Sequence, residues 1–138
     1  MGTRAVFTFK DERNEFHIYK HWDGYPSGAA GFLTMAIGKS WGLKRFEADD
    51  FAAAFIVANK TAGGDVYLTK HYDEHGDLSY RYELSQSRNG QLIVTAIDMI
   101  EDETVFNGRL KDFVDKHGEI DIKRMWNTFD DSENKLVA

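Results

Sequence analysis

The side chains that could do chemistry are densest in one ten-residue stretch, from His17 to Pro26. On an extended strand His17, Tyr19 and His21 share one face, because alternate residues point the same way. Two-residue steps of about 7 Å put the two histidines about 13 Å apart, too far to share one metal ion. Two interpretations stay open: a binding surface, or a half-exposed sheet face that ends in a proline turn.

A second polar run follows another expected strand, where Tyr67, Thr69 and His71 alternate. His71 and His75 enclose two carboxylates, and in a loop these groups could converge on a metal ion. The run shows neither a recognised zinc-ligand spacing nor the twelve-residue pattern of a calcium loop. We therefore predict no metal site and no cofactor.

Arg81 stands between Tyr80 and Tyr82 in the sequence, but on a strand it shares its face with Ser79 and Glu83. An ion pair with Glu83 is the plainer interpretation. The functional interpretation is an arginine that holds a phosphate or carboxylate while a nearby aromatic ring stacks on a base.

The sequence offers no complete catalytic motif. It has no Gly-x-Ser-x-Gly turn for a serine nucleophile, and its lack of cysteine removes thiol chemistry. Gly63-Gly64 is a weak candidate for a phosphate loop, and the end of a helix explains it better. His21 and Asp23 could form an acid–base pair, although a turn between them leaves their geometry open. We therefore assign no catalytic residue.

We predict a ligand-binding site where the second strand runs into the proline turn, since rigid scaffolds present binding groups at strand ends. Aromatic rings offer stacking surfaces worth about 1 to 3 kcal/mol per base, and an arginine offers a fork for an anion. The prediction requires the third and fourth strands to lie beside the first hairpin. The plainer alternative is that Trp22 and Tyr25 plug the end of the core. The predicted site consists of Tyr19, His21, Trp22, Asp23, Tyr25, His71 and Arg81.

Alternating and helical patterns indicate the elements that must position these side chains. Asn89-Gly90 predicts a tight hairpin, because both residues tolerate positive φ. A last helix is expected between a cap at Asn107 and a stop at Gly118. The other two helices are expected over 27–39 and from residue 49 to the glycines at 63 and 64. The expected strands are 5–9, 15–21, 65–71, 78–84 and 91–99.

These elements predict an α+β fold, an antiparallel sheet of about five strands with two or three helices packed on one face. The fifth strand is apolar on both faces and should lie inside the sheet. The predicted core includes Phe51, Phe55, Leu92 and Phe113. Residues 1–129 should form a single domain, and the acidic segment 130–138 should fray. Before that tail, the apolar residues Ile120, Ile122, Met125, Trp126 and Phe129 are expected to dock on the domain.

Composition restricts the partners and the compartment. The net charge of −6 over 138 residues disfavours nucleic acid as a partner, because phosphates repel an acidic surface. The absence of cysteine excludes disulfides and suits a reducing compartment. No stretch reaches the roughly 18 apolar residues of a membrane span, and the start lacks a signal-peptide core. We expect a cytoplasmic protein that binds no membrane.

Four segments in the same order carry a resemblance: TRA at 3–5, HWDGYP at 21–26, RFEADDFAAA at 45–54 and HGDLSYRYE at 75–83. With these segments the chain resembles a group of uncharacterised small proteins from bacteriophages and prophages. The resemblance implies a viral or mobile-element setting, in the cytoplasm of a host cell. Small accessory proteins in that setting counter host defence by binding a defence protein or by trapping its nucleotide signal.

We therefore expect a non-catalytic accessory protein that sequesters a host defence protein or a small nucleotide. Aromatic residues on strand faces that the helices cannot all cover predict a homo-oligomer, most simply a dimer. One alternative is a small hydrolase or nuclease, with or without a metal, that uses His21, Asp23 and either His71 or His75. Another alternative is a structural or assembly protein of a virion.

Overall fold

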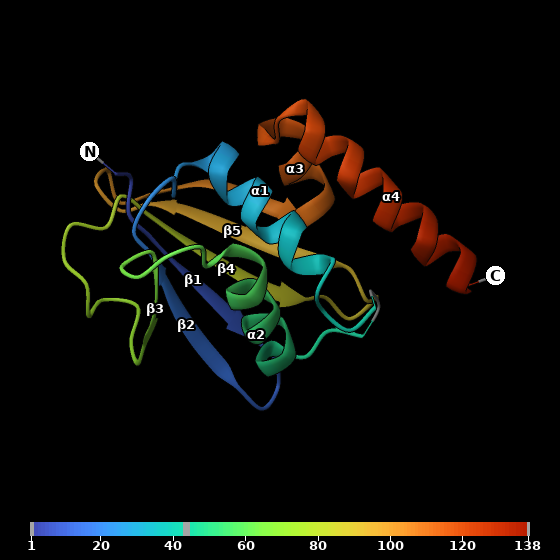
Figure 1. Ribbon diagram of the computed structural model, residues 1–138, viewed down its shortest axis with the longest axis horizontal. Helices are drawn as coiled ribbons and strands as arrows, with labels where there is room; N and C mark the ends of the chain where they lie inside the picture. The colour runs from blue at the N-terminus through green and yellow to red at the C-terminus, as the bar shows by residue number, and fades with distance from the viewer. Residues whose placement is uncertain (1, 43–44, 138) are drawn as a thin grey trace.

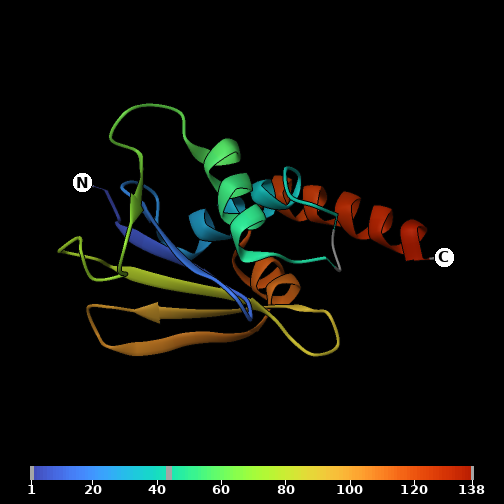
Figure 2. The same cartoon turned by 90° about the horizontal axis from the view of Figure 1, so that it is seen from below.

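The computed structural model describes residues 2–42 and 45–137, with the side chains described up to residue 129. Six strands form one sheet in the order β3-β2-β1-β4-β5-β6. The four helices lie together on one face of this sheet, as Figures 1 and 2 show. We call the opposite side the open face. The elements are β1 (Ala5–Lys10), β2 (Glu15–Lys20), α1 (Pro26–Ile37), α2 (Ala48–Asn59), β3 (Val66–Thr69), β4 (Tyr80–Gln86), β5 (Leu92–Asp98), β6 (Glu103–Arg109), α3 (Leu110–His117) and α4 (Ile120–Val137).

The predicted hairpin between β1 and β2 is confirmed, with Phe7 opposite Ile18. Its turn forms because the Asp11 carboxylate accepts hydrogen bonds from the backbone N–H groups of Arg13 and Asn14, each at 2.8 Å. Such a local bond holds the chain in a turn without help from distant residues. The hairpin therefore follows directly from the local sequence.

The core lies between the sheet and the helices. Phe55 of α2 is fully buried against Phe7, with ring centroids 4.7 Å apart, and against Phe9 at 5.4 Å. The predicted core residues Phe51, Phe55, Leu92 and Phe113 are all buried. The periodic stripe of α2 therefore faces the sheet, as expected of an amphipathic helix.

The prediction of an all-antiparallel sheet is wrong in one place, because β4 pairs with β1 in the parallel direction. β1 is the inner strand of its hairpin and needs a partner on its free edge. The chain supplies that partner only after passing through α1, α2 and β3, and such a long crossover permits parallel pairing. Val6 and Thr8 of β1 are consequently buried although they point to the open face.

The prediction missed a sixth strand. Residue Asn107, expected to cap a helix, lies in β6 opposite Thr95, and α3 begins at Leu110. β6 is an edge strand with mostly exposed side chains, so the sequence shows no clear apolar alternation there. It gives β5 a partner on its second edge, which confirms that β5 lies inside the sheet.

The C-terminal segment forms a fourth helix, α4, where we expected only a docked segment. Trp126 is buried, and Ile122 and Phe129 pack against the core. Met125 is half-buried, whereas Ile120 is 65% exposed and does not dock. The helix backbone continues to Val137, and the side chains from residue 130 onward lie outside the described part, so the frayed tail stays a prediction. Across the described residues, no helix has the length and apolar character of a membrane span.

Candidate functional site

A row of side chains crosses the open face at its middle. Val6 pairs with Tyr19 on one side and with Arg81 on the other, so all three point the same way. Two strand spacings separate Tyr19 from Arg81, which is about 10 Å. The parallel pairing of β1 with β4 thus meets the condition on which the predicted site depended.

Aromatic rings gather around Tyr19 at one end of this row. The His75 ring stacks on the Tyr19 ring, with centroids 3.8 Å apart and planes 7° from parallel. Tyr67 of the neighbouring edge strand lies 5.8 Å from Tyr19 and 5.7 Å from His75. Burial raises the pKa of the Tyr19 phenol, so its hydroxyl stays protonated at neutral pH.

Two further predicted residues extend this cluster. The Tyr19 hydroxyl and His21 Nδ1 share a hydrogen bond of 2.8 Å. Trp22 stands edge-on to His21, with ring centroids 4.8 Å apart. The indole of Trp22 is 42% exposed and the phenol of Tyr25 is 41% exposed, so neither plugs the core. The plainer alternative that we left open for these two residues is therefore wrong.

Arg81 occupies the other end of the row. Its Nη2 donates to Glu83 Oε1 at 2.8 Å, which confirms the expected ion pair. Its guanidinium also lies 3.7 Å from the centre of the Tyr72 ring, in a cation–π contact. Its Nε is buried and has no hydrogen-bond partner within the described residues. A buried donor without an acceptor is costly, so Nε can still accommodate an anionic oxygen.

The loop between β3 and β4, residues 70–79, supplies the rings that cover this row; it is the long yellow-green loop beside β3 in Figure 1. Few polar contacts hold it. Thr69 Oγ1 donates to the Glu74 carboxylate at 2.9 Å, and Arg4 pairs with Asp77 at 3.6 Å. The hydrogen bond from Thr69 lowers the pKa of Glu74.

The binding site predicted from the sequence took His71 from this loop and included neither Tyr72 nor His75, which we had considered only for the hydrolase alternative. His71 is exposed, and its backbone oxygen accepts a hydrogen bond from Thr69 at 2.9 Å. His75, by contrast, reaches back to Tyr19. No periodic signal marks which loop residue returns to the sheet, because that depends on the path of the whole loop.

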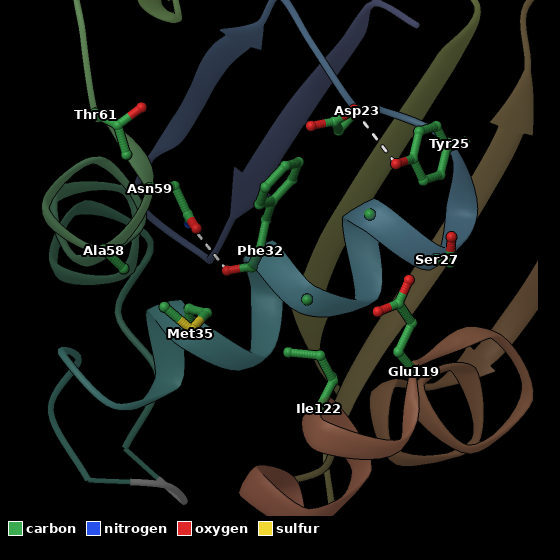
Figure 3. A pocket seen from close by; sticks show the side chains of 12 residues that line it. Asp23, Tyr25, Ser27, Phe32, Met35, Ala58, Asn59, Thr61, Glu119 and Ile122 are labelled. Carbon is green, nitrogen blue, oxygen red and sulfur yellow. Dashed lines mark hydrogen bonds between the residues drawn. The ribbon is translucent and has the colours of Figure 1, made fainter.

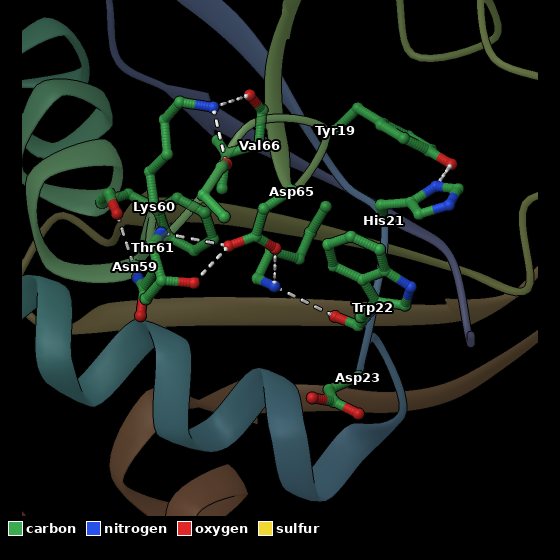
Figure 4. A network of polar contacts seen from close by, with 12 residues as sticks. Tyr19, His21, Trp22, Asp23, Asn59, Lys60, Thr61, Asp65 and Val66 are labelled. Atoms are coloured by element: carbon green, nitrogen blue, oxygen red, sulfur yellow. Dashed lines mark hydrogen bonds and ion pairs between the residues drawn. The ribbon is translucent and has the colours of Figure 1, made fainter. Parts of the chain in front are cut away.

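The predicted site splits into two at Asp23. This residue has a left-handed backbone, with φ of 63°, which turns the chain away from the open face. Its carboxylate accepts a hydrogen bond from the Tyr25 hydroxyl at 3.3 Å, and Figure 4 shows it below Trp22, toward the start of α1. His21 and Asp23 therefore do not form the acid–base pair that we considered.

A buried ion pair, which sequence reasoning missed, fixes the end of β2 (Figure 4). Lys20 Nζ bonds the Asp65 carboxylate and also donates to the Trp22 carbonyl at 3.2 Å. Burial opposes the ionisation of Asp65, but the hydrogen bonds from Lys20 and Thr61 outweigh it and lower its pKa. The backbone N–H of His21 donates to the Asp65 carbonyl at 2.9 Å. This network holds His21 and Trp22 in place.

A hydroxyl, an imidazole and a carboxylate also line up on the open face. Thr8 Oγ1 lies 2.8 Å from His17 Nδ1, and His17 Nε2 lies 3.1 Å from the Glu15 carboxylate. The Thr8 side chain is only 2% exposed, which leaves a substrate no path to its hydroxyl. We therefore interpret the hydrogen-bonded series of Thr8, His17 and Glu15 as structural rather than catalytic. No group of three His, Asp or Glu side chains in the described part of the chain could hold a metal ion.

On the helix side, a groove of about 360 Å³ opens beside α1. Asp23 and Tyr25 line it together with residues of α1, the end of α2 and the start of α4 (Figure 3). Two of the seven predicted residues thus belong to this groove. The other members of the predicted site lie on the open face, except His71, which lies in the 70–79 loop.

Comparison with protein-family models, with curated proteins and with solved structures found no match to this chain. The fold and the open face define an α+β protein whose sheet carries a cluster of aromatic rings around Tyr19 and a guanidinium, that of Arg81, in the same row.

Proposed function

We propose that the protein is a non-catalytic binding protein that sequesters a small nucleotide on the open face of its sheet. The observation that carries the proposal is Arg81, whose buried Nε lacks a partner in the described residues and whose guanidinium lies against the Tyr72 ring. A guanidinium beside stacking surfaces offers both halves of nucleotide recognition, one for the phosphate and one for the base.

The base would take the place that His75 now fills. The imidazole of His75 lies flat on Tyr19 at 3.8 Å, which is the arrangement of a base on an aromatic platform. A purine or pyrimidine has a larger π-face than imidazole, and stacking is worth about 1 to 3 kcal/mol per base. The base can thus displace His75 from Tyr19.

The phosphate would then lie at Arg81. Tyr19 and Arg81 stand about 10 Å apart in one row, a span that a nucleotide with one or more phosphates covers from base to phosphate. Opening of the 70–79 loop would uncover Arg81 Nε by lifting Tyr72. Opening must break the part-buried bond from Thr69 to Glu74 and the exposed Arg4–Asp77 pair, and it must separate His75 from Tyr19 and Tyr72 from Arg81. Contacts of the bound nucleotide with Tyr19 and Arg81 would replace the two ring contacts.

The biological setting comes from the resemblance to phage and prophage proteins. In that setting the ligand would be a nucleotide signal of host defence, and binding without turnover would silence it. The hydrolase alternative loses its proposed pair, because His21 bonds Tyr19 while Asp23 bonds Tyr25. Capture of a defence protein, or a role in a virion, would use the same exposed rings without need of the Arg81 donor.

Calorimetric titration of the purified protein tests the proposal against a panel of mononucleotides, dinucleotides and cyclic nucleotides. Saturable binding of at least one nucleotide is expected, and chromatography of the same samples should recover it unchanged. Arg81→Gln should weaken binding about tenfold to a hundredfold, because a charge-assisted hydrogen bond is lost. Arg88→Gln, at an exposed position in the turn between β4 and β5, is the matched control and should bind normally.

His75→Ala gives a result in the opposite direction. Removal of the imidazole frees Tyr19, so the variant should bind the same nucleotide more tightly than the wild type. The proposal is rejected if no nucleotide binds at millimolar concentration, or if the nucleotide is converted to a product. Weaker binding by His75→Ala would reject the displacement of His75 by the base.

A further inference from the structure

We propose that the groove beside α1 is a second, separate binding site, and that it takes an ammonium or guanidinium group carried on an apolar stem. This groove, the helix-side groove, lies between α1, the end of α2 and the start of α4 and has a volume of about 360 Å³ (Figure 3). It faces away from the row on the open face, so its ligand is independent of the nucleotide proposed above.

Two glycines of α1 line the groove. Gly28 and Gly31 are three residues apart on α1 and therefore lie on one face of the helix. A Cβ at Gly28 would stand 1.9 Å from the backbone oxygen of Asp23, so no side chain fits there. A Cβ at Gly31 would meet Ile122 at an ordinary contact distance of 3.5 Å, so a methyl group fits there and would narrow the groove.

One end of the groove is acidic. The carboxylates of Asp23 and Glu119 lie on either side of the Tyr25 hydroxyl. Both carboxylates line the same groove, and their charges, Asp23 first and Glu119 to a smaller extent, raise the pKa of Tyr25. Among the described residues no basic side chain forms an ion pair with either carboxylate. Two unpaired negative charges that act on one space favour a cation between them.

The neutral polar groups of the groove point to the same class of ligand. Asn59 is 94% buried, since only 6% of it is exposed, and its amide nitrogen donates to the carbonyls of Phe32 and Phe55, both at 3.0 Å. An amide with its donors engaged offers only its oxygen to a ligand. The Tyr25 hydroxyl donates to Asp23, and the Thr61 hydroxyl donates to Asp65 at 3.2 Å. The carboxylates and the Asn59 amide thus present acceptors, and of the polar side chains that line the groove only the Ser27 hydroxyl can still donate. A ligand that brings donors matches most of this polar lining.

The rest of the lining is apolar. Phe32, Met35 and Ile122 line the groove beyond the carboxylates, and Met35 is 39% exposed. A methionine side chain adapts to ligands of different shape. An inorganic cation would leave this apolar surface in water, whereas an organic cation with an apolar stem covers it. The chemistry fits both a free amine and a lysine or arginine side chain of another protein.

Two-dimensional NMR titration of the ¹⁵N-labelled protein tests this assignment with phenethylamine, which carries an ammonium on an apolar stem. Saturable shifts are expected at the amides of Gly28, Gly31 and Thr61. The neutral analogue 2-phenylethanol should cause no saturable shift there. Agmatine and a short arginine-containing peptide form two further arms, which separate a free guanidinium from one presented by a polypeptide.

Two matched variants test whether the carboxylate of Glu119 contributes to the binding of the cation. Glu119→Gln should weaken phenethylamine binding about fivefold, the effect expected of one part-exposed ion pair. Glu101→Gln removes an equal charge at an exposed turn between β5 and β6 and should leave binding unchanged. Arg81→Gln should also leave it unchanged, which keeps this result separate from that of the nucleotide titration.

Equal binding of phenethylamine and 2-phenylethanol would overturn the proposal, since the charge would then play no part. Shifts confined to the open face would overturn the location. If Glu119→Gln binds phenethylamine as tightly as the wild type while Glu101→Gln binds it more weakly, the proposed site is wrong. Binding would then reflect only the general attraction of a cation to an acidic protein.

Discussion

His75 lies flat on Tyr19, with ring centroids 3.8 Å apart, and this contact ties the middle of the 70–79 loop to the sheet. Tyr19 belongs to β2, and His75 approaches it from the loop that leads to β4. The loop therefore carries a planar group of its own to the surface on which we propose that a base stacks. While His75 stacks on Tyr19, the imidazole covers the Tyr19 ring, and once His75 moves away a nucleotide base can stack on that ring.

Loss of the His75 ring should loosen the loop and leave the fold intact. An aromatic pair contributes about 0.5 to 1.5 kcal/mol beyond its buried area, so His75→Ala should lower the free energy of unfolding by about that amount. Amide hydrogen exchange should accelerate in residues 70–79 and stay unchanged in β1. If exchange accelerates equally in residues 70–79 and in β1, the loop opens only when the whole protein unfolds, and the prediction is wrong.

Truncation of the central aromatic residue should be severe. Phe55 is fully buried between Phe7, Phe9 and Phe32, so Phe55→Ala should cost about 3 to 5 kcal/mol of unfolding free energy in urea titrations. Val57→Ala, at a position of the same helix that is 69% exposed, is the control and should cost little. Similar midpoints for both variants would contradict the orientation of α2.

Separation of the buried Lys20–Asp65 pair should destabilise the end of β2. Asp65→Asn leaves the Lys20 ammonium without its counter-ion and should cost about 3 to 5 kcal/mol. Asp112→Asn breaks the exposed pair with Arg109 and should cost less than about 1 kcal/mol. Chemical denaturation at neutral pH measures both, and equal costs would argue against the buried character of the first pair.

The same pair predicts how stability depends on pH. The pKa of Asp65 is lowered in the folded state from its ordinary value of 3.8, so the folded protein holds the carboxylate charged more strongly than the unfolded chain does. This contribution is complete above pH 3.8 and is lost as the pH falls below 3.8 through the folded pKa. Wild type should lose more stability than Asp65→Asn between pH 4 and pH 2, and parallel losses would contradict the assignment.

Trp22→Ala should stay folded, because its indole is 42% exposed and packs on His21 at the surface. Circular dichroism should show the wild-type spectrum. An unfolded variant would restore the view that Trp22 seals the core.

The homo-oligomer predicted from the sequence remains a prediction, most simply a dimer. The edge strand β3 leaves Tyr67 44% exposed and Leu68 77% exposed, and such an edge can pair with a second copy. Light scattering at micromolar concentration should report twice the chain mass of 15.8 kDa. A species of 15.8 kDa alone would contradict it, and Leu68→Lys should dissociate a dimer built on this edge.

The sequence by itself determined the local elements. Asp11 directs the turn of the first hairpin through bonds to its near neighbours. The predicted hairpin at Asn89-Gly90 joins β4 to β5, and of the two residues only Gly90 adopts the positive φ, 86°, that the prediction rested on. The stripe that includes Phe51 and Phe55 oriented α2 toward the sheet. In each case the interaction that decides the structure lies within a few residues, so periodicity and turn chemistry reveal it.

Only the tertiary structure decided which strands and rings meet. β4 pairs with β1 because the packing of α1 and α2 leaves that edge of the hairpin free, and no local pattern encodes a free edge. The polar strand β6 forms because β5 offers it an edge. The left-handed backbone of Asp23 divides the predicted site, and the path of the 70–79 loop brings His75 rather than His71 to Tyr19. These contacts join residues far apart in the chain, and their free energy depends on the whole packed fold.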